Sequence, residues 1–503
     1  MAESTKLVRG LGLLDATMIV VGSMIGSGIF LTSAESSRLV GSPGWLLMAW
    51  ALAGVLTITG ALCCAELAAM WPRAGGQYVF LREAYGPSIG FLFGWGLFLI
   101  IQSGTVAAVA VAFANFTGVL TDKVSAENYL ISPIVLLRPF RLGAVSFNGY
   151  ALCLSTQQLL AFVMILFLTF VNTRGLKIGK VIQNTFTFTK TAALLGLILI
   201  GLFLGWNHGS AAYTSSWWRP WENGWQPSVA QVGFEPLTHG MLVLALVMLV
   251  GRAMVGPLFA QSAWNNVTFT AGEVRDPGRN LPRSLLLGCG LVVGLYLLAN
   301  LAYVVTLPLA GIQNAPQNRV ATALMQAALG PKGTVIMAIA IMISTFGCNN
   351  GLILAGARVY YAMARDGLFF EKLAQVHPRL QTPMFAIIAG AVWSAILAVT
   401  GTFDQLLTYV VFVGWIFYSL AAASVLVYRK RDPKAVRPYR VPGYPVTPLL
   451  FIIAAAALVL NTIFTQPTRA AIGLGMVMLG APAYIIWNSK RSKYKSVEVE
   501  ENA

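Results

Sequence analysis

Hydrophobic positions along this chain form long unbroken runs, not the alternating or heptad stripes of soluble domains. About 20 consecutive apolar residues suffice for a helix to cross the hydrocarbon core of a bilayer. We therefore predict an all-α polytopic membrane protein with twelve transmembrane helices. The predicted spans are 11–38, 43–71, 88–120, 150–172, 176–205, 240–270, 284–306, 331–363, 383–402, 404–428, 446–466 and 469–488.

Composition and charge fit the same class. The 503 residues are 57% apolar and 10% charged, whereas soluble domains carry about 25% charged residues. A net charge of +16 could indicate nucleic-acid binding, but most of the 34 Lys and Arg residues fall on one side of the predicted membrane. The positive-inside rule makes that side cytoplasmic and places both termini there, so no nucleic-acid partner is expected.

The stretch Gly22–Phe30 interrupts the first predicted span with three glycines and two serines. Each glycine costs a helix interior roughly 1 kcal/mol relative to alanine, and backbone freed from a helix in lipid needs other partners. We interpret the stretch as a helix break whose free amides and carbonyls suit a ligand with separate negative and positive groups, such as an α-amino acid. Close helix packing through Gly22 and Gly26 is the alternative.

A second interruption lies in the sixth predicted span, where Val255–Asn266 contains a Gly-Pro pair and a polar Gln-Ser pair. Spans 1–5 and 6–10 form two halves, and an odd number of spans per half inverts the second half. Interruptions at corresponding positions of two inverted halves predict a substrate site between them. A simple proline kink is the alternative.

Two charged residues fall inside predicted spans. Lys190 lies in the middle of the fifth span, where a charge costs at least ~2.5 kcal/mol. We expect a functional or ion-replacing role, with its ammonium bound by carbonyls of a nearby broken helix or by Ser344 or Thr345; snorkelling is the alternative. Arg252 is expected to snorkel or to bind a local carbonyl, with lining of an outer vestibule as the alternative.

The remaining polar residues show no catalytic or metal-binding pattern. Glu66 is expected to pair with Arg73 or Arg82, with an ion or proton ligand as the alternative. No metal, cofactor or enzyme activity is expected, because the three histidines are scattered and no catalytic groups converge in sequence. No disulfide framework is expected either, since the cysteines lie in or at the edge of predicted spans: Cys63, Cys64, Cys153, Cys289 and Cys348.

With these residues considered, the chain resembles the amino acid–polyamine–organocation (APC) transporter family, and within it the L-type and cationic amino acid transporter branches. The resemblance implies a 5+5 inverted-repeat core with discontinuous helices 1 and 6, followed by two further helices. It is carried by Gly22–Phe30, Ala65–Leu67, Pro72–Tyr78, Lys177–Lys190, Phe259–Asn265, Asn280–Pro282, Ala357–Gly367 and Arg437–Pro445.

The resemblance also implies roles for residues of both interruptions. The amides of Ser27 and Gly28 and the Ser27 hydroxyl would bind the substrate carboxylate, and the carbonyls of Met24, Phe259 and Ser262 would bind its ammonium. The aromatic ring of Phe259 would act as an outer gate, while Trp264 and Asn265 would support the unwound turn. The implied substrate-binding set comprises Ser23, Met24, Ile25, Gly26, Ser27, Gly28, Phe259, Ala260, Ser262, Trp264 and Asn265.

Lys190 would replace the sodium ion of sodium-coupled relatives by bridging Gly22 and Ser344. The expected function is therefore sodium-independent secondary transport of L-amino acids by alternating access, by exchange. Neutral substrates are favoured because the interruptions contain no acidic residue. Proton-coupled symport, including of cationic substrates, is the alternative, and a channel or a transporter-like substrate sensor is the alternative from another class. Gln261-Ser262-Ala263 departs from the aromatic residue and two glycines common in L-type relatives, which leaves side-chain preference open.

The expected organisation follows from these spans. The outer loop after span 3 lacks the cysteine that links L-type transporters to a glycoprotein, so no disulfide-linked heavy chain is expected. Short tails and the lack of a targeting signal favour a bacterial inner membrane. The predicted segments are a cytoplasmic tail (1–10), a first repeat (11–205), an extracellular loop (206–239), a second repeat (240–428), a basic cytoplasmic loop (429–445), two further helices (446–488) and a cytoplasmic tail (489–503).

Overall fold

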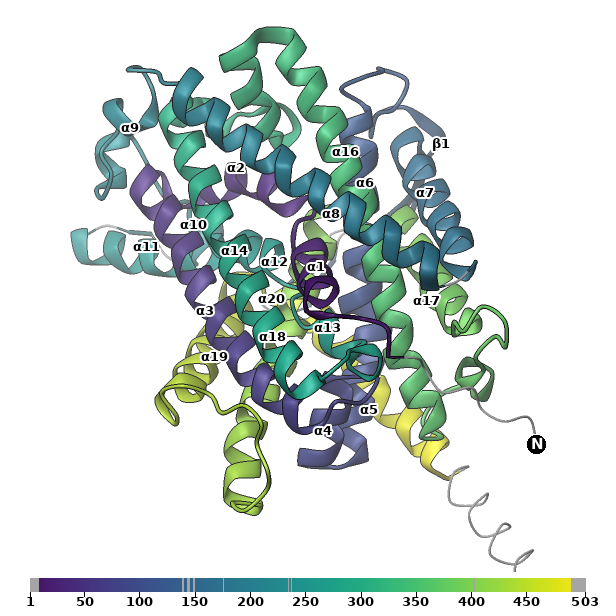
Figure 1. The fold of residues 1–503 in the computed structure, drawn as a ribbon. Coiled ribbons are helices and arrows are strands. Elements are labelled where there is room, and N and C mark those ends of the chain that lie inside the picture. Colours follow the sequence, from purple (N-terminus) through teal and green to yellow (C-terminus); the bar gives the residue numbers. More distant parts are fainter. Residues whose placement is uncertain are drawn as a thin grey trace, which may run out of the picture.

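The computed structural model describes residues 9–489, except 138–139, 143–144, 148–149, 175, 234, 237 and 401–402. Most of the two predicted tails, 1–10 and 489–503, lies outside the described residues. Within the described part, ten helices are long and apolar enough to cross a membrane, and the bent pair α1 (Leu13–Met24) and α2 (Gly28–Val40) supplies one more. The shorter apolar helix α17 (Met384–Thr400) corresponds to the remaining predicted span. The protein is thus an all-α, multi-pass membrane protein (Figure 1).

The helices of the first half follow the predicted spans closely. Interior glycines allow close helix packing here; a Cβ at Gly54, for example, would lie only 2.6 Å from the side chain of Val293. After α1 and α2 come α3 (Pro43–Met70), the short amphipathic α4 (Gln77–Tyr85), α5 (Pro87–Gly96), the π-helix η1 (Leu97–Ile101), α6 (Gln102–Thr117), α7 (Thr156–Thr173), α8 (Leu176–Leu199) and the π-helix η2 (Ile200–Leu204).

The second half and the connecting segments contain the remaining helices. They are α9 (Ala211–Thr214), η3 (Pro220–Asn223), α10 (Val229–Val232), α11 (His239–Ala253), α12 (Val255–Ala260), α13 (Asn266–Phe269), η4 (Ala271–Glu273), α14 (Pro277–Thr306), α15 (Leu309–Gln313), η5 (Pro316–Asn318), α16 (Val320–Arg365), η6 (Glu371–Ala374), α17, α18 (Phe403–Arg431), α19 (Val446–Thr465) and α20 (Pro467–Met478).

The segment before α7 differs from the prediction. The sequence predicts a loop followed by a span from 150, but the structure forms two antiparallel strand pairs there, and the helix begins only at Thr156. Cys153 therefore lies on a strand and is partly exposed, not embedded in a span. The strands are β1 (Tyr129–Leu137), β2 (Phe140–Leu142), β3 (Val145–Phe147) and β4 (Tyr150–Ser155), with Tyr129 opposite Ser155 and Phe140 opposite Phe147.

The helix α1 lies inside the bundle, with α8, α14 and α16 packed around it (Figure 1). The helices α6 and α8 both pack on α16, and α3 packs on α14. We call the side that carries β1 and β4 the outer side and the side that carries α4 the inner side, following the charge distribution. This arrangement buries both chain interruptions at the centre of the molecule.

The buried carboxylate of Glu66 is paired, but not with the expected partners. Arg429 donates to it from Nε at 3.0 Å and from Nη2 at 2.7 Å. The Val441 amide donates to the same carboxylate at 2.7 Å, and Arg437 lies 3.5 Å away. The expectation of Arg73 or Arg82 was wrong because proximity in sequence does not decide which basic loop folds over the end of α3.

Candidate functional site

The first interruption separates α1 from α2 with a bend of 41°. Met24 ends α1 and Gly28 begins α2, so the first amides of α2 lack carbonyl partners within the helix. The hydroxyl of Ser27 is buried and has no hydrogen-bond partner among the described residues, and the same holds for Ser23. Free amides, a helix N-terminus and an unpaired hydroxyl together form a site suited to a carboxylate.

The second interruption lies between the end of α12 at Ala260 and the start of α13 at Asn266. The Ser262 hydroxyl donates to the Phe259 carbonyl at 2.7 Å. Asn265 donates to Gln77 Oε1 at 2.9 Å and accepts from the Tyr418 hydroxyl at 3.1 Å. These bonds fasten the turn to α4 and α18.

Within this turn Ala263 adopts a φ of +64°. An L-residue with a side chain is strained in this left-handed region, at a cost of roughly 1–2 kcal/mol. The ring of the neighbouring Trp264 packs 5.3 Å from that of Tyr418. The turn is therefore held in its conformation by its surroundings, not by its own backbone preference.

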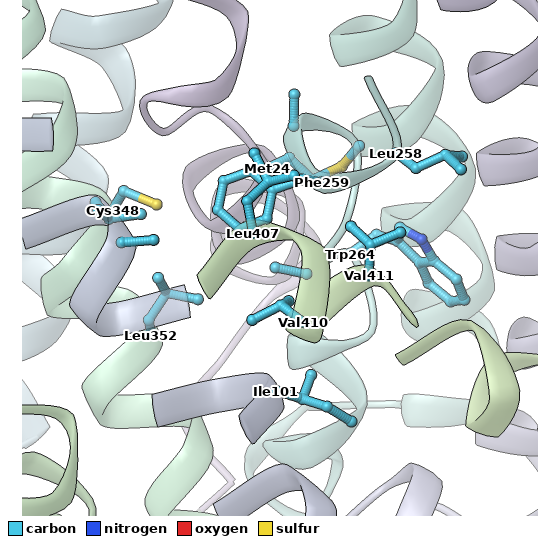
Figure 2. Packing of buried hydrophobic residues seen from close by; sticks show 14 of the residues in the cluster. Met24, Ile101, Leu258, Phe259, Trp264, Cys348, Leu352, Leu407, Val410 and Val411 are labelled. Carbon is cyan, nitrogen blue, oxygen red and sulfur yellow. The ribbon is translucent and has the colours of Figure 1, made fainter. Parts of the chain in front are cut away.

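The two interruptions face each other. A Cβ placed on Gly28 would lie 2.5 Å from the Cβ of Ala260, so the two backbones approach as closely as a glycine permits. Figure 2 shows the apolar residues around this contact, with Met24 from α1, Phe259 from α12 and Leu407 from α18. The Phe259 ring is 5% exposed and meets the Phe403 ring edge-on at 6.0 Å.

Carbonyls of both interruptions, two of them predicted to bind an ammonium, already have donors in this conformation. The Tyr296 hydroxyl donates to the Met24 carbonyl at 2.9 Å, and the Phe259 carbonyl accepts from Ser262. Cys348 donates to the Ser23 carbonyl at 3.3 Å. A carbonyl oxygen has two lone pairs, so a ligand ammonium can share the Met24 carbonyl with Tyr296. The Phe259 carbonyl, in contrast, already accepts from both the hydroxyl and the amide of Ser262, the latter at 3.1 Å.

Lys190 is fully buried and its ammonium donates to the Gly22 carbonyl, at the end of α1 next to the first interruption. Ser344 donates to the Ile25 carbonyl at a long 3.5 Å and makes no bond to Lys190 in this conformation. A Cβ on Gly22 would collide with Thr187 and Gln183, which lie about one and two turns before Lys190 on α8. Gly22 thus fits tightly against a polar face of α8.

The structure contains a cavity on the outer side, one beside the second interruption and one on the inner side. The outer one has a volume of about 320 Å³ and reaches down to Gly256 and Phe403. Beside the second interruption, a cavity of about 20 Å³ is lined by Ser262, Asn265 and neighbouring residues of α6 and α18. A third, of about 370 Å³, opens on the inner side between α4 and the end of α16. The cavity beside the second interruption is thus much smaller than the outer and inner ones.

Arg252 lines the outer cavity together with Glu35 and Arg469. The structure thus favours the vestibule alternative for Arg252 over snorkelling into the headgroups. Arg252 is the second-last residue of α11 and is partly buried.

Sequence reasoning missed three buried polar residues that contact the interruptions: Gln183, Tyr296 and Cys348. Gln183 is 3% exposed, and neither atom of its amide has a partner among the described residues. A usable signal existed for it, because Gln183, Thr187 and Lys190 are spaced i, i+4 and i+7 and so share one helix face. Tyr296 and Cys348 are single residues in apolar spans, and nothing in their spacing marks them.

Comparison with known proteins identifies the family that has this architecture. The profile of the family described as Amino acid permease matches residues 11–486. The chain is 29% identical over 494 residues to the mouse Large neutral amino acids transporter small subunit 2, covering 96% of this chain and 82% of the relative. It is 28% identical over 484 residues to the Serine/threonine exchanger SteT of Bacillus subtilis, covering 96% and 97%. The human b(0,+)-type amino acid transporter 1 is 28% identical over 466 residues, covering 93% and 85%.

Proposed function

Because the chain belongs to the amino acid permease family, we propose that it is a sodium-independent exchanger of neutral L-amino acids that works by alternating access. Family membership makes it a multi-pass membrane transporter and not an enzyme. The single observation that carries the finer proposal is the bond from the buried Lys190 ammonium to the Gly22 carbonyl. A fixed positive charge at the broken helix occupies a position that a coupling cation would otherwise take.

The substrate would lie between the two interruptions. Its carboxylate would bind the first amides of α2 and the unpaired Ser27 hydroxyl, which are the free donors of the first interruption. Its ammonium would bind the carbonyls of Met24 and Ser262, and that of Phe259 once the Ser262 hydroxyl turns away from it. We propose a neutral side chain, because the small cavity beside Ser262 and Asn265 has no acidic residue in its lining. Exchange is also named for the relative SteT.

Phe259 is proposed to open and close the route from the outer cavity. Its ring contacts Phe403, which itself lines that cavity, so the proposed gate borders the outer cavity. Movement of the ring would admit the substrate, and its return would cover the substrate. Trp264 and Asn265 are proposed to keep the turn beneath it in place.

We further propose that the chain works in a bacterial inner membrane, with both termini cytoplasmic, and without a disulfide-linked subunit. The cytoplasmic placement of the termini is supported by the distribution of basic residues. Four of the five cysteines are buried, but the partly exposed Cys153 lies on β4, in the outer segment between α6 and α7, which is longer than the predicted loop and does contain a cysteine. A disulfide to a second subunit would therefore have to involve Cys153. Uptake by the chain reconstituted alone would support function without a disulfide-linked subunit. If uptake begins only after a second subunit is added, that proposal is wrong.

The decisive experiment is uptake of a labelled amino-acid panel into proteoliposomes that are empty, preloaded with amino acid, or subjected to a pH gradient, with and without sodium. Uptake only into preloaded vesicles, unchanged by sodium, is the expected result. Uptake into empty vesicles driven by an inward proton gradient would replace exchange with proton-coupled symport. Saturable binding without any uptake would instead indicate a substrate sensor.

A further inference from the structure

A cavity on the inner side is lined by arginines and is separate from the proposed substrate site. Its volume is about 370 Å³, and its walls come from the loop after α3, from α4, from η4 and from the end of α16. None of the residues assigned to the two interruptions lines it. Its charged lining residues are Arg73, Arg82, Arg365 and Asp366.

Two of these charges neutralise each other. Arg82 forms an ion pair with Asp366 and a second with Glu83 at 2.6 Å. The Tyr78 hydroxyl also donates to Asp366, at 2.7 Å. Burial and the negative charge of Asp366 both raise the pKa of Tyr78 well above its usual value, so the phenol stays protonated and remains a donor. The Asp366 carboxylate is therefore bound by two side chains of α4, those of Tyr78 and Arg82.

The other two arginines are not neutralised. Arg73 and Arg365 are exposed, and the described part of the chain places no carboxylate within ion-pair distance of either. An aromatic ring lies beside each guanidinium, Trp71 at 5.6 Å from Arg73 and Tyr361 at 5.8 Å from Arg365. These contacts hold the side chains near the cavity and reduce the entropy lost when both bind one ligand.

We propose that this cavity binds a phosphate-class anion, held between the guanidinium groups of Arg73 and Arg365. The planar fork of an arginine matches the oxygens of a phosphate group and can donate two parallel hydrogen bonds to it. Two arginines on separate elements can therefore clamp one phosphate from two directions. The anion is either the headgroup of an anionic phospholipid at the inner membrane surface or a free phosphate compound.

Occupancy of the cavity connects segments on which transport would depend. The loop that carries Arg73 is joined to the segment after the second interruption, because the Gly75 amide donates to the Phe269 carbonyl at 3.1 Å. Arg365 lies at the end of α16, which is already tied to η4 by the buried ion pair of Arg358 and Glu273 at 3.0 Å. A bound anion would add a direct link between the loop that carries Arg73 and the end of α16. If the proposed function holds, occupancy slows opening of the inner side and lowers the uptake rate.

Binding is tested without reference to transport, by calorimetric titration of the purified protein with inorganic pyrophosphate. The variants are Arg73→Gln, Arg365→Gln and the double variant, and Arg379→Gln is the control because Arg379 is exposed but does not line the cavity. Each single variant is expected to bind about tenfold more weakly, since it loses a charge-assisted contact. The double variant is expected to lose binding, and the control to match the wild type.

A second arm separates the two sources of the anion. The protein is reconstituted in phosphatidylcholine with or without phosphatidylglycerol, and the retained lipid is identified by native mass spectrometry. Phosphatidylglycerol retained by the wild type but not by the double variant assigns a lipid headgroup, whereas pyrophosphate binding alone assigns a free phosphate compound. Wild-type protein that binds neither probe, a double variant that binds as well as the wild type, or displacement of pyrophosphate by neutral amino acids overturns the proposal. Loss of uptake in all variants, including the control, would bear on the proposed function and not on this cavity.

Discussion

The two chain interruptions are built in opposite ways. At the first, the carbonyls around the break accept bonds from side chains of three other helices, through Lys190, Tyr296 and Cys348, while the serine hydroxyls stay unpaired. At the second, Ser262 bonds within the turn and Asn265 bonds to Gln77 and Tyr418. The first interruption thus keeps donors free for a ligand, whereas the second is a fixed support against which the ligand can be held.

The proposal that the first interruption binds the ligand is tested most directly by adding a side chain there. Gly28→Val is expected to abolish substrate binding, because even the first added carbon would lie 2.5 Å from Ala260. Binding is measured by the shift in thermal unfolding caused by substrate, with monodispersity in detergent as the control for folding. Wild-type binding by this variant would mean that the ligand does not lie between the two interruptions.

Lys190→Ala is expected to reduce uptake at least tenfold while the protein still inserts. The substitution removes the buried donor to the Gly22 carbonyl and leaves that carbonyl unpaired, which costs about 1–3 kcal/mol. Initial uptake rates per inserted protein give the measurement. An unchanged rate would show that the charge has no part in transport.

Tyr296→Phe and Tyr303→Phe form a matched pair on α14. The hydroxyl of Tyr296 donates to the Met24 carbonyl at 2.9 Å, next to the proposed ammonium site, whereas that of Tyr303 donates to the Ile29 carbonyl at 3.2 Å, within α2. Loss of one neutral hydrogen bond costs about 1 kcal/mol. We expect a several-fold change in substrate affinity for the first variant and stability loss alone for the second. Equal effects of both on affinity would remove the special role of the Met24 carbonyl.

The smallest expected effect concerns the second interruption. Ala263→Gly relieves the positive φ of +64° and should stabilise the protein by up to about 1 kcal/mol, seen as a higher unfolding temperature. If the turn is a fixed support, uptake should stay near the wild-type rate because Asn265 and Trp264 still hold it. A large fall in uptake would show that the strained alanine itself is required.

The span pattern, the membrane class and both interruptions were predictable from sequence. Hydrophobic runs and glycine or proline interruptions are local signals, and lipid leaves few alternatives to a continuous helix. The burial of Lys190 was also predictable, since a lone charge inside a span requires a partner. These features depend on whether a segment lies in lipid or in water, and not on which helices pack against each other.

Features that depend on tertiary contacts were missed. Glu66 pairs with Arg429, a residue 363 positions away, whereas the sequence suggested nearby arginines. Tyr296 and Gln183 contact the first interruption from other helices, and no local pattern states which helix faces which. The strands around Cys153 resemble the start of a span in sequence, because a short apolar strand and a helix end have similar composition.

The start of the chain is joined to the segment after the second interruption. The Leu11 amide donates to the Glu273 carbonyl at 3.0 Å, and the Arg275 amide donates to the Leu11 carbonyl at 2.8 Å. The segments before α1 and after α13 are therefore joined on the inner side, next to the ion pair of Glu273 and Arg358. If the protein opens to the inner side as proposed, separating these two segments would break both backbone bonds together. Such coupled breakage would favour concerted opening and would limit leakage of solute through a half-open protein.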